Sequence, residues 1–136
     1  MITHILDTSA WLIHIFKEPG SAQITDLFKD GDHRVAVSAV SLVEVYARLK
    51  SAGRGSDFVR VIDLYRQLFR AFMPATESVV FQAVELRNAA TSRLPSIDSI
   101  IAATAASHGA TLVHRDAHFL TIPENNLKQQ YLESEE

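Results

Sequence analysis

The sequence contains no cysteine and no long apolar run. The lack of cysteine excludes thiolate zinc sites, iron–sulfur clusters and cysteine nucleophiles, and it fits a reducing compartment. The longest uncharged stretch, residues 99–114, is shorter than the ~20 apolar residues of a membrane-spanning helix. The N-terminus also lacks the basic segment and apolar core of a signal peptide. We therefore expect a cytoplasmic protein without a membrane segment.

Length and composition indicate one compact domain. The chain has 136 residues, of which 47% are hydrophobic and 21% charged. We expect a single domain over residues 1–132 and an acidic tail over 133–136. The net charge of −3 argues against general adhesion to nucleic acid, but residues 48–70 carry a local charge of +4. A solvated amphipathic helix and a phosphate-facing patch both explain this cluster.

Short apolar segments alternate with helical patterns along the chain, which is typical of an α/β fold. We expect strands at residues 4–6, 34–37, 72–75, 111–113 and 127–132. We expect helices at residues 9–17, 24–29, 40–50, 77–91 and 97–108, and apolar residues also recur at helical spacing from 58 to 72. Right-handed crossovers would place helices on both faces of a mainly parallel sheet. The expected architecture is a three-layer α/β/α, Rossmann-like fold.

Asp7 follows the first expected strand directly. In open parallel sheets, ligands bind beyond the carboxyl ends of the strands, where Asp7 would lie. Capping of the next helix is the alternative role, and it would contribute about 1 kcal/mol. Thr8 and Ser9 are also good capping residues, so capping alone does not require the acid.

Three further acids stand beside apolar segments, namely Glu44, Asp98 and Asp116. A buried carboxylate must be paired, hydrogen-bonded or metal-bound, because burying its charge alone is costly. Arg115 could pair with one of them, but few other basic residues are near in sequence. Carboxylates gathered at one edge of a sheet suit Mg²⁺ or Mn²⁺, and such ions support phosphoryl transfer. The pattern therefore predicts a metal-dependent site.

The segments ILDTSAWL, VSLVEVYARL and PSIDSIIAATAASHGATLVHRDAHF resemble the PIN-domain nucleases, especially the VapC-type ribonuclease toxins of toxin–antitoxin pairs. The resemblance runs from residue 5 to residue 119. It implies a single PIN domain that hydrolyses RNA phosphodiester bonds with water activated by Mg²⁺ or Mn²⁺. It also implies a homodimer and a cognate antitoxin, which apolar positions within residues 13–16 and 40–49 would help to bind.

The resemblance also assigns roles to individual residues. Four acids resemble the metal-binding and catalytic acids of the family, in the order Asp7, Glu44, Asp98 and Asp116. Four neighbours resemble residues that support the site or the substrate, namely Thr8, Ser9, Ser41 and Arg115. One departure stands out, because many members carry a further acid shortly after the fourth, where this chain has Ala117 and His118.

Other interpretations of these motifs are weaker. Ser9 stands where a phosphoaspartate enzyme needs a second Asp, and no glycine-rich turn follows the first strand as a dinucleotide site requires. His114 and His118 are not the helical pair that zinc favours, so we interpret them as surface or loop histidines. Trp11 is expected in the core. The remaining alternative is a catalytically weak PIN-fold module that binds RNA or a protein.

Overall fold

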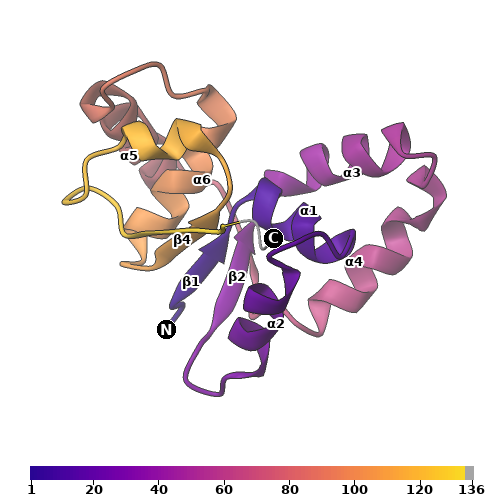
Figure 1. The fold of residues 1–136 in the computed structure, drawn as a ribbon. Helices are drawn as coiled ribbons and strands as arrows, with labels where there is room; N and C mark the ends of the chain where they lie inside the picture. Colours follow the sequence, from indigo (N-terminus) through magenta and orange to yellow (C-terminus); the bar gives the residue numbers. More distant parts are fainter. Residues whose placement is uncertain (134–136) are drawn as a thin grey trace.

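The computed structural model describes residues 1–133 and contains a five-stranded sheet in which every neighbouring pair of strands is parallel (Figure 1). The strands are β1 (His4–Leu6), β2 (Val35–Ser38), β3 (Phe72–Met73), β4 (Thr111–His114) and β5 (Gln129–Tyr131). Their spatial order is β3-β2-β1-β4-β5. The predicted α/β class with a parallel sheet is confirmed. The expected acidic tail lies outside the described residues from 134 onward.

The helices form two layers, one on each face of the sheet. They are α1 (Thr8–Ile15), α2 (Ser21–Lys29), α3 (Ser41–Ser51), α4 (Phe58–Arg66), α5 (Glu77–Ala89) and α6 (Ser96–Ser107). Two short 3₁₀ turns are η1 (Gly55–Asp57) and η2 (Ala117–Thr121). One core contains residues of α1 to α4, and the other contains residues of α5, α6 and η2. The three-layer arrangement is therefore as expected.

The central strands contribute alternate residues to these two cores. In β1, Leu6 packs with the first helical layer and Ile5 with the second. The same alternation separates Val113 from Leu112 in β4. Strands buried on both faces have near-continuous apolar sequences, which explains the short apolar runs. Trp11 is fully buried in the first core, as predicted.

The helical spacing from 58 to 72 does not form one helix. Helix α4 ends at Arg66, and the chain then runs through Phe69 to β3. Phe69 and Phe72 nevertheless pack on the same core as Tyr65, with ring centroids 5.5 Å apart for Tyr65–Phe69 and 5.8 Å for Phe69–Phe72. The apolar period continues past the helix because these rings share one face of the core.

The strand order places a ligand-binding position between β1 and β4. The order reverses at β1, because β2 and β3 lie on one side of it and β4 and β5 on the other. Ligands of open parallel sheets bind beyond the carboxyl ends of the strands at such a reversal.

Within residues 1–133, no helix has both the length and the apolar character needed to cross a bilayer.

Candidate metal centre

Asp7 lies at the carboxyl end of β1, at the point where the strand order reverses. Its backbone N–H donates to the carbonyl of Val113 at 3.0 Å, which ties it to β4. Its side chain caps α1 by accepting from the N–H of Ala10 at 2.8 Å. The Ser9 hydroxyl lies 2.7 and 2.8 Å from the two carboxylate oxygens of Asp7. Asp7 therefore serves as the cap and also occupies the ligand-binding edge.

Glu44 reaches the same edge from α3, the helix that follows β2. It lies in the first turn of that helix. The Thr8 hydroxyl donates to Oε1 of Glu44 and lies 3.0 Å from the Ser41 hydroxyl oxygen. These contacts join the start of α1 to the start of α3, so Thr8 and Ser41 hold Glu44 beside the end of β1.

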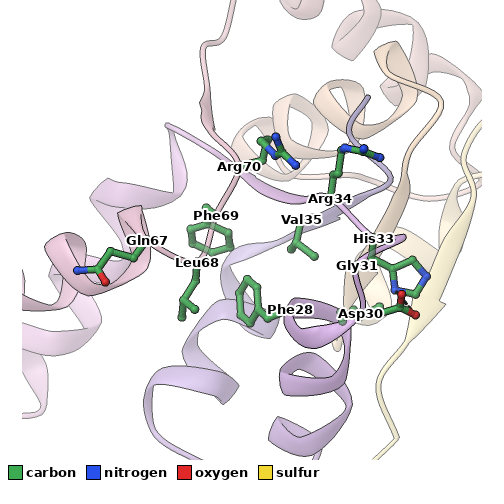
Figure 2. A pocket seen from close by; sticks show the side chains of 11 residues that line it. Phe28, Asp30, Gly31, His33, Arg34, Val35, Gln67, Leu68, Phe69 and Arg70 are labelled. Atoms are coloured by element: carbon green, nitrogen blue, oxygen red, sulfur yellow. Dashed lines mark ion pairs between the residues drawn. The ribbon is translucent and has the colours of Figure 1, made fainter.

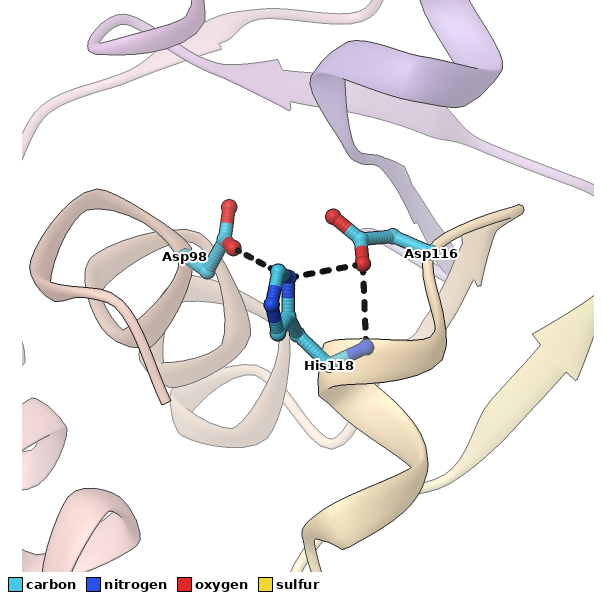
Figure 3. A group of neighbouring side chains, drawn as sticks. All are labelled: Asp98, Asp116 and His118. Carbon is cyan, nitrogen blue, oxygen red and sulfur yellow. Dashed lines mark hydrogen bonds and ion pairs between the residues drawn. The ribbon is translucent and has the colours of Figure 1, made fainter. Parts of the chain in front are cut away.

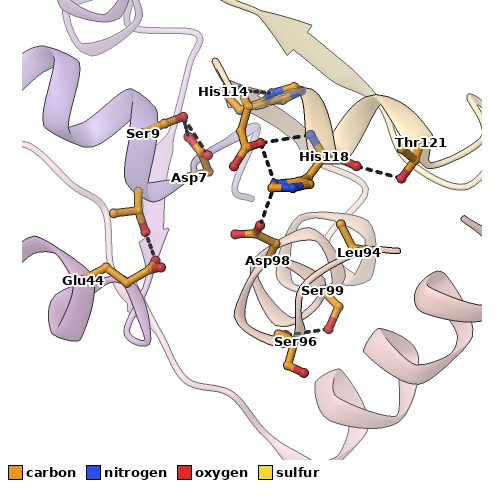
Figure 4. A network of polar contacts seen from close by, with 12 residues as sticks. Asp7, Ser9, Glu44, Leu94, Ser96, Asp98, Ser99, His114, His118 and Thr121 are labelled. Atoms are coloured by element: carbon orange, nitrogen blue, oxygen red, sulfur yellow. Dashed lines mark hydrogen bonds and ion pairs between the residues drawn. The ribbon is translucent and has the colours of Figure 1, made fainter. Parts of the chain in front are cut away.

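Asp98 and Asp116 approach from the β4 side. Helix α6 leads into the start of β4, so its own first turn, which contains Asp98, lies at the opposite, carboxyl edge of the sheet. Asp116 follows the end of β4 by two residues. Figure 4 shows Asp7, Glu44, Asp98 and His118 directed toward a common region.

His118 joins these two acids, as Figure 3 shows. Its Nδ1 lies 2.9 Å from Oδ1 of Asp116 and 3.7 Å from Oδ2 of Asp98. Its backbone N–H also donates to Oδ1 of Asp116 at 2.9 Å. One donor atom from each of the three side chains lies within 4.8 Å of the others. Sequence reasoning missed this role, although His118 stands near the position where many PIN domains carry a further acid.

The pKa shifts show that the carboxylates affect one another. The pKa of Asp7 is raised to about 7, mainly by burial and to a smaller extent by the charge of Asp116, although the hydrogen bonds from Ala10 and Ser9 lower it. The pKa of Asp98 is raised to about 6 by burial and by the charges of Asp116 and Glu44 together. The ionised forms are thus disfavoured when only protein groups surround them. A bound cation would reverse this cost.

The donor set fits a divalent cation. Carboxylate oxygens are the ligands that Mg²⁺ and Mn²⁺ prefer, and an imidazole nitrogen is accepted more readily by Mn²⁺ and later transition metals. Asp7 is 2% exposed and the Asp98 side chain 17% exposed, whereas the His118 side chain is 55% exposed. The site is therefore open on the His118 side and closed beneath Asp7.

Two expectations, one about His114 and one about Arg115, were wrong. His114 is fully buried rather than at the surface, and it is hydrogen-bonded through Nε2 to Gln129 at 2.8 Å. It belongs to β4, whose side chains are covered on both faces. The Arg115 guanidinium pairs with no acid of the described chain, because it donates to the carbonyls of Leu132 at 2.9 Å and Glu133 at 3.0 Å. Its backbone N–H donates to the Ser9 hydroxyl at 3.0 Å, so Arg115 still contacts the site residues.

A separate depression of about 380 Å³ lies at the opposite edge of the sheet (Figure 2). Arg34 and Arg70, which line it, come just before β2 and β3. Its lining also includes the rings of Phe28 and Phe69, whose centroids are 5.5 Å apart. Asp30 is the one acid among its lining residues. The acidic centre and this depression are therefore distinct.

The family model described as "PIN domain" matches residues 4–125, which include all four acids. The chain belongs to the PIN domain family. The family expectation drawn from the three sequence segments is confirmed. No curated protein sequence matches this PIN domain.

Several solved structures share the fold of this PIN domain. VapBC2 from Rickettsia felis, bound to a DNA fragment from its promoter, matches with a TM-score of 0.78 and 23% identity over 98% of this chain and 100% of that chain. DNA-bound VapBC from Salmonella typhimurium matches with a TM-score of 0.78 and 16% identity over 97% of this chain and 99% of that chain. VapBC-1 from nontypeable Haemophilus influenzae matches with a TM-score of 0.74 and 18% identity over 97% of this chain and 98% of that chain. At these identities the likeness establishes the common fold.

Proposed function

We propose that this PIN domain is a metal-dependent endoribonuclease and the toxin of a toxin–antitoxin pair. The observation that carries the proposal is the grouping of Asp98, Asp116 and His118 within 4.8 Å at the ligand-binding edge of the sheet. Asp7 and Glu44 complete this group. The charge of Asp116 raises the pKa of Asp7, and the charge of Glu44 raises the pKa of Asp98, so these carboxylates lie close enough to interact. A pure binding module would gain nothing from carboxylates that repel the phosphates of RNA.

Asp7, Glu44, Asp98 and Asp116 would hold Mg²⁺ or Mn²⁺, with His118 as a further donor. When bound, such a cation supplies a Lewis acid that activates water and offsets charge on the phosphodiester. The protein groups themselves hold the ligands in position. The Ser9 hydroxyl orients the Asp7 carboxylate, and the Thr8 hydroxyl orients that of Glu44. Hydrogen bonds of this kind fix the direction of metal ligands.

An antitoxin is the proposed protein partner. The similar structures from Rickettsia felis, Salmonella typhimurium and Haemophilus influenzae are VapBC complexes, and that from Klebsiella pneumoniae is a toxin-antitoxin complex. On α3 of this chain, Val43 is 75% exposed and Tyr46 is 43% exposed, which supports the expected apolar contact within residues 40–49. In the other expected segment, Ile13 is only 4% exposed and belongs to the core.

Three further parts of the proposal concern the organisation of the protein. We propose that residues 1–132 act as one PIN domain, which the family match over residues 4–125 supports. We propose a homodimer, which the exposed side chains of Val80, Phe81 and Val84 on α5 support as a separate apolar surface. We also propose that the protein acts in the cytoplasm, where its RNA substrate would be found.

The test is a metal-titrated cleavage assay on total cellular RNA, with the Asp98→Asn variant as control. The wild type should cleave RNA when Mg²⁺ or Mn²⁺ is added and stop when EDTA is added, while Asp98→Asn remains inactive under both conditions. Binding of RNA without cleavage at any metal concentration would instead assign the chain to the catalytically weak PIN modules.

A further inference from the structure

The cationic segment of residues 48–70 divides into paired and unpaired arginines. Arg54 Nε donates to Asp57 at 3.0 Å, and Arg60 Nη2 donates to the same carboxylate at 2.8 Å. The charges of these two arginines are therefore satisfied locally. The exposed Arg48 has no carboxylate within salt-bridge distance in residues 1–133, and its guanidinium lies over the Phe16 ring, 5.2 Å from the centroid.

Arg48 stands beside the acidic centre. It lies four residues after Glu44 on α3, so the two side chains share one face of the helix, one turn apart. A depression beside the centre is lined by Thr8, Glu44 and Arg48, and an adjoining one by Phe16, Arg48 and Arg115. Ser9 and Leu12 line both depressions, so they form one groove that leads from the acids along α1 and α3.

The stacked geometry leaves Arg48 ready to bind an anion. A guanidinium that lies over an aromatic ring is held by its face, while its N–H donors remain free at the edge. Those donors match two oxygens of a phosphate through paired hydrogen bonds. Arg115 also lines the groove, but its guanidinium already donates to the carbonyls of Leu132 and Glu133. Glu18 lines the groove near Phe16, so Arg48 is the available cation on the side of the acids.

We propose that Arg48 binds the backbone phosphate of the nucleotide next to the cleaved bond, and so draws an RNA strand along the groove between α1 and α3. This inference rests on the proposed nuclease function. Four carboxylates repel RNA, and Arg48, which lies four residues after Glu44 and about 6 Å further along the helix axis, offsets that repulsion at the scale of one nucleotide step. Arg48 is thus a substrate-binding residue that positions the strand.

The experiment measures RNA binding apart from cleavage. Arg48→Gln and Arg48→Lys are each placed in the Asp98→Asn background, and anisotropy of a labelled random-sequence RNA oligonucleotide is followed at fixed Mg²⁺ over a series of KCl concentrations. Arg66→Gln is the matched control, because Arg66 is also exposed and stacked on a phenylalanine, 4.9 Å from the Phe72 centroid, but lines neither depression. Thermal melts of each variant show that the fold is retained.

We expect Arg48→Gln to weaken RNA binding about 3- to 10-fold at low salt and to reduce the slope of log affinity against log salt by about 0.7. Arg48→Lys should keep most of the slope, because it keeps the charge, and Arg66→Gln should change neither quantity. Equal binding by Arg48→Gln and Arg66→Gln would overturn the proposal, as would an Arg48→Gln effect confined to binding of a protein partner. Cleavage by the wild type is scored separately, so RNA binding that depends on Arg48 without cleavage would refute only the nuclease function.

Discussion

The Ser9 hydroxyl bridges the two carboxylate oxygens of Asp7, at 2.7 and 2.8 Å, and accepts the backbone N–H of Arg115 at 3.0 Å. One hydroxyl thus joins the acid after β1 to the loop that carries Asp116. The Ser9 hydrogen bond also favours the ionised form of Asp7, since it lowers a pKa that burial raises. Ser9 therefore favours the charged form of Asp7, which is the form that binds a cation.

Replacement of Ser9 tests this supporting role. Ser9→Ala should lower the affinity for Mn²⁺ and the cleavage rate by about 10- to 100-fold, the usual cost of removing a group that orients a metal ligand. Calorimetric Mn²⁺ titration and initial cleavage rates would measure the two effects. Ser107→Ala, whose hydroxyl donates to Oε1 of Gln82 at 2.6 Å at the end of α6, is the control and should leave both unchanged. Unchanged Mn²⁺ affinity in Ser9→Ala would contradict the role.

Removal of the two most perturbed acids should separate activity from stability. The Asp7→Asn, Asp98→Asn double variant should lose cleavage by more than ~100-fold, because it removes proposed ligands outright. Without metal it should melt a few degrees above the wild type at pH 7.5, because burial and like charges disfavour the ionised carboxylates. Asparagine at position 7 can still accept the capping hydrogen bond. A large drop in melting temperature would instead show that these two acids stabilise the fold.

Metal binding should stabilise the native state of the wild type. A ligand that binds the folded chain alone raises its melting temperature with concentration, so Mn²⁺ and Mg²⁺ should each do so. His118 should favour Mn²⁺ over Mg²⁺, because imidazole nitrogen suits Mn²⁺ better. His118→Asp should therefore reduce the Mn²⁺ preference, and His108→Asn, at the far end of α6, should leave it unchanged.

The double variant Asp7→Asn, Asp98→Asn serves as a second control for the effect of metal binding on the melting temperature. It should show no shift in melting temperature with either ion. A shift equal to that of the wild type would place the cation elsewhere on the protein.

Acid should destabilise the protein through His14. Burial lowers the pKa of His14, whose Nδ1 lies 2.6 Å from the Tyr65 hydroxyl and whose Nε2 lies 3.1 Å from Oγ1 of Thr25. Below the ordinary histidine pKa of about 6.5, the unfolded chain binds more protons than the folded one, so stability falls as the pH decreases from 7 to 5. Asp7 and Asp98 act in the opposite direction, since their raised pKa values favour the folded state as they become protonated.

The measurement of the His14 effect therefore uses the Asp7→Asn, Asp98→Asn background without metal. Melting temperatures should decrease by several degrees between pH 7 and pH 5 in this background, and by less when His14→Gln is added. Parallel pH profiles with and without His14→Gln would show that other histidines, such as the buried His114, dominate.

Toxicity in cells tests the proposed biological role. Expression of the wild type alone should slow growth, and co-expression of a small protein encoded beside it should restore growth. Asp98→Asn should remove the toxicity while still binding that partner, because the exposed Val43 and Tyr46 are unchanged. Growth rates and affinity copurification provide the readouts. An enzyme that is active in vitro, harmless in cells and purified without a partner from its native host would refute the antitoxin role alone.

The sequence by itself determined the architecture and the approximate place of the site. Apolar runs alternating with helical patterns require a parallel sheet covered on both faces, because each strand is apolar on both of its sides. Asp7 could be placed at the carboxyl edge because it directly follows β1. The same local signals did not fix the end of α4, since Phe69 and Phe72 continue its apolar spacing beyond Arg66 for reasons of core packing.

The tertiary structure decided which side chains meet. Asp7, Glu44, Asp98 and Asp116 are far apart in sequence, and their approach depends on a strand order that reverses at β1. The contacts of His118 with Asp98 and Asp116, and the turn of the Arg115 guanidinium toward Leu132, depend on how η2 and β5 pack beside β4. Local sequence constrains backbone conformation and burial, whereas electrostatic partners are set by distances between elements that only the folded chain defines.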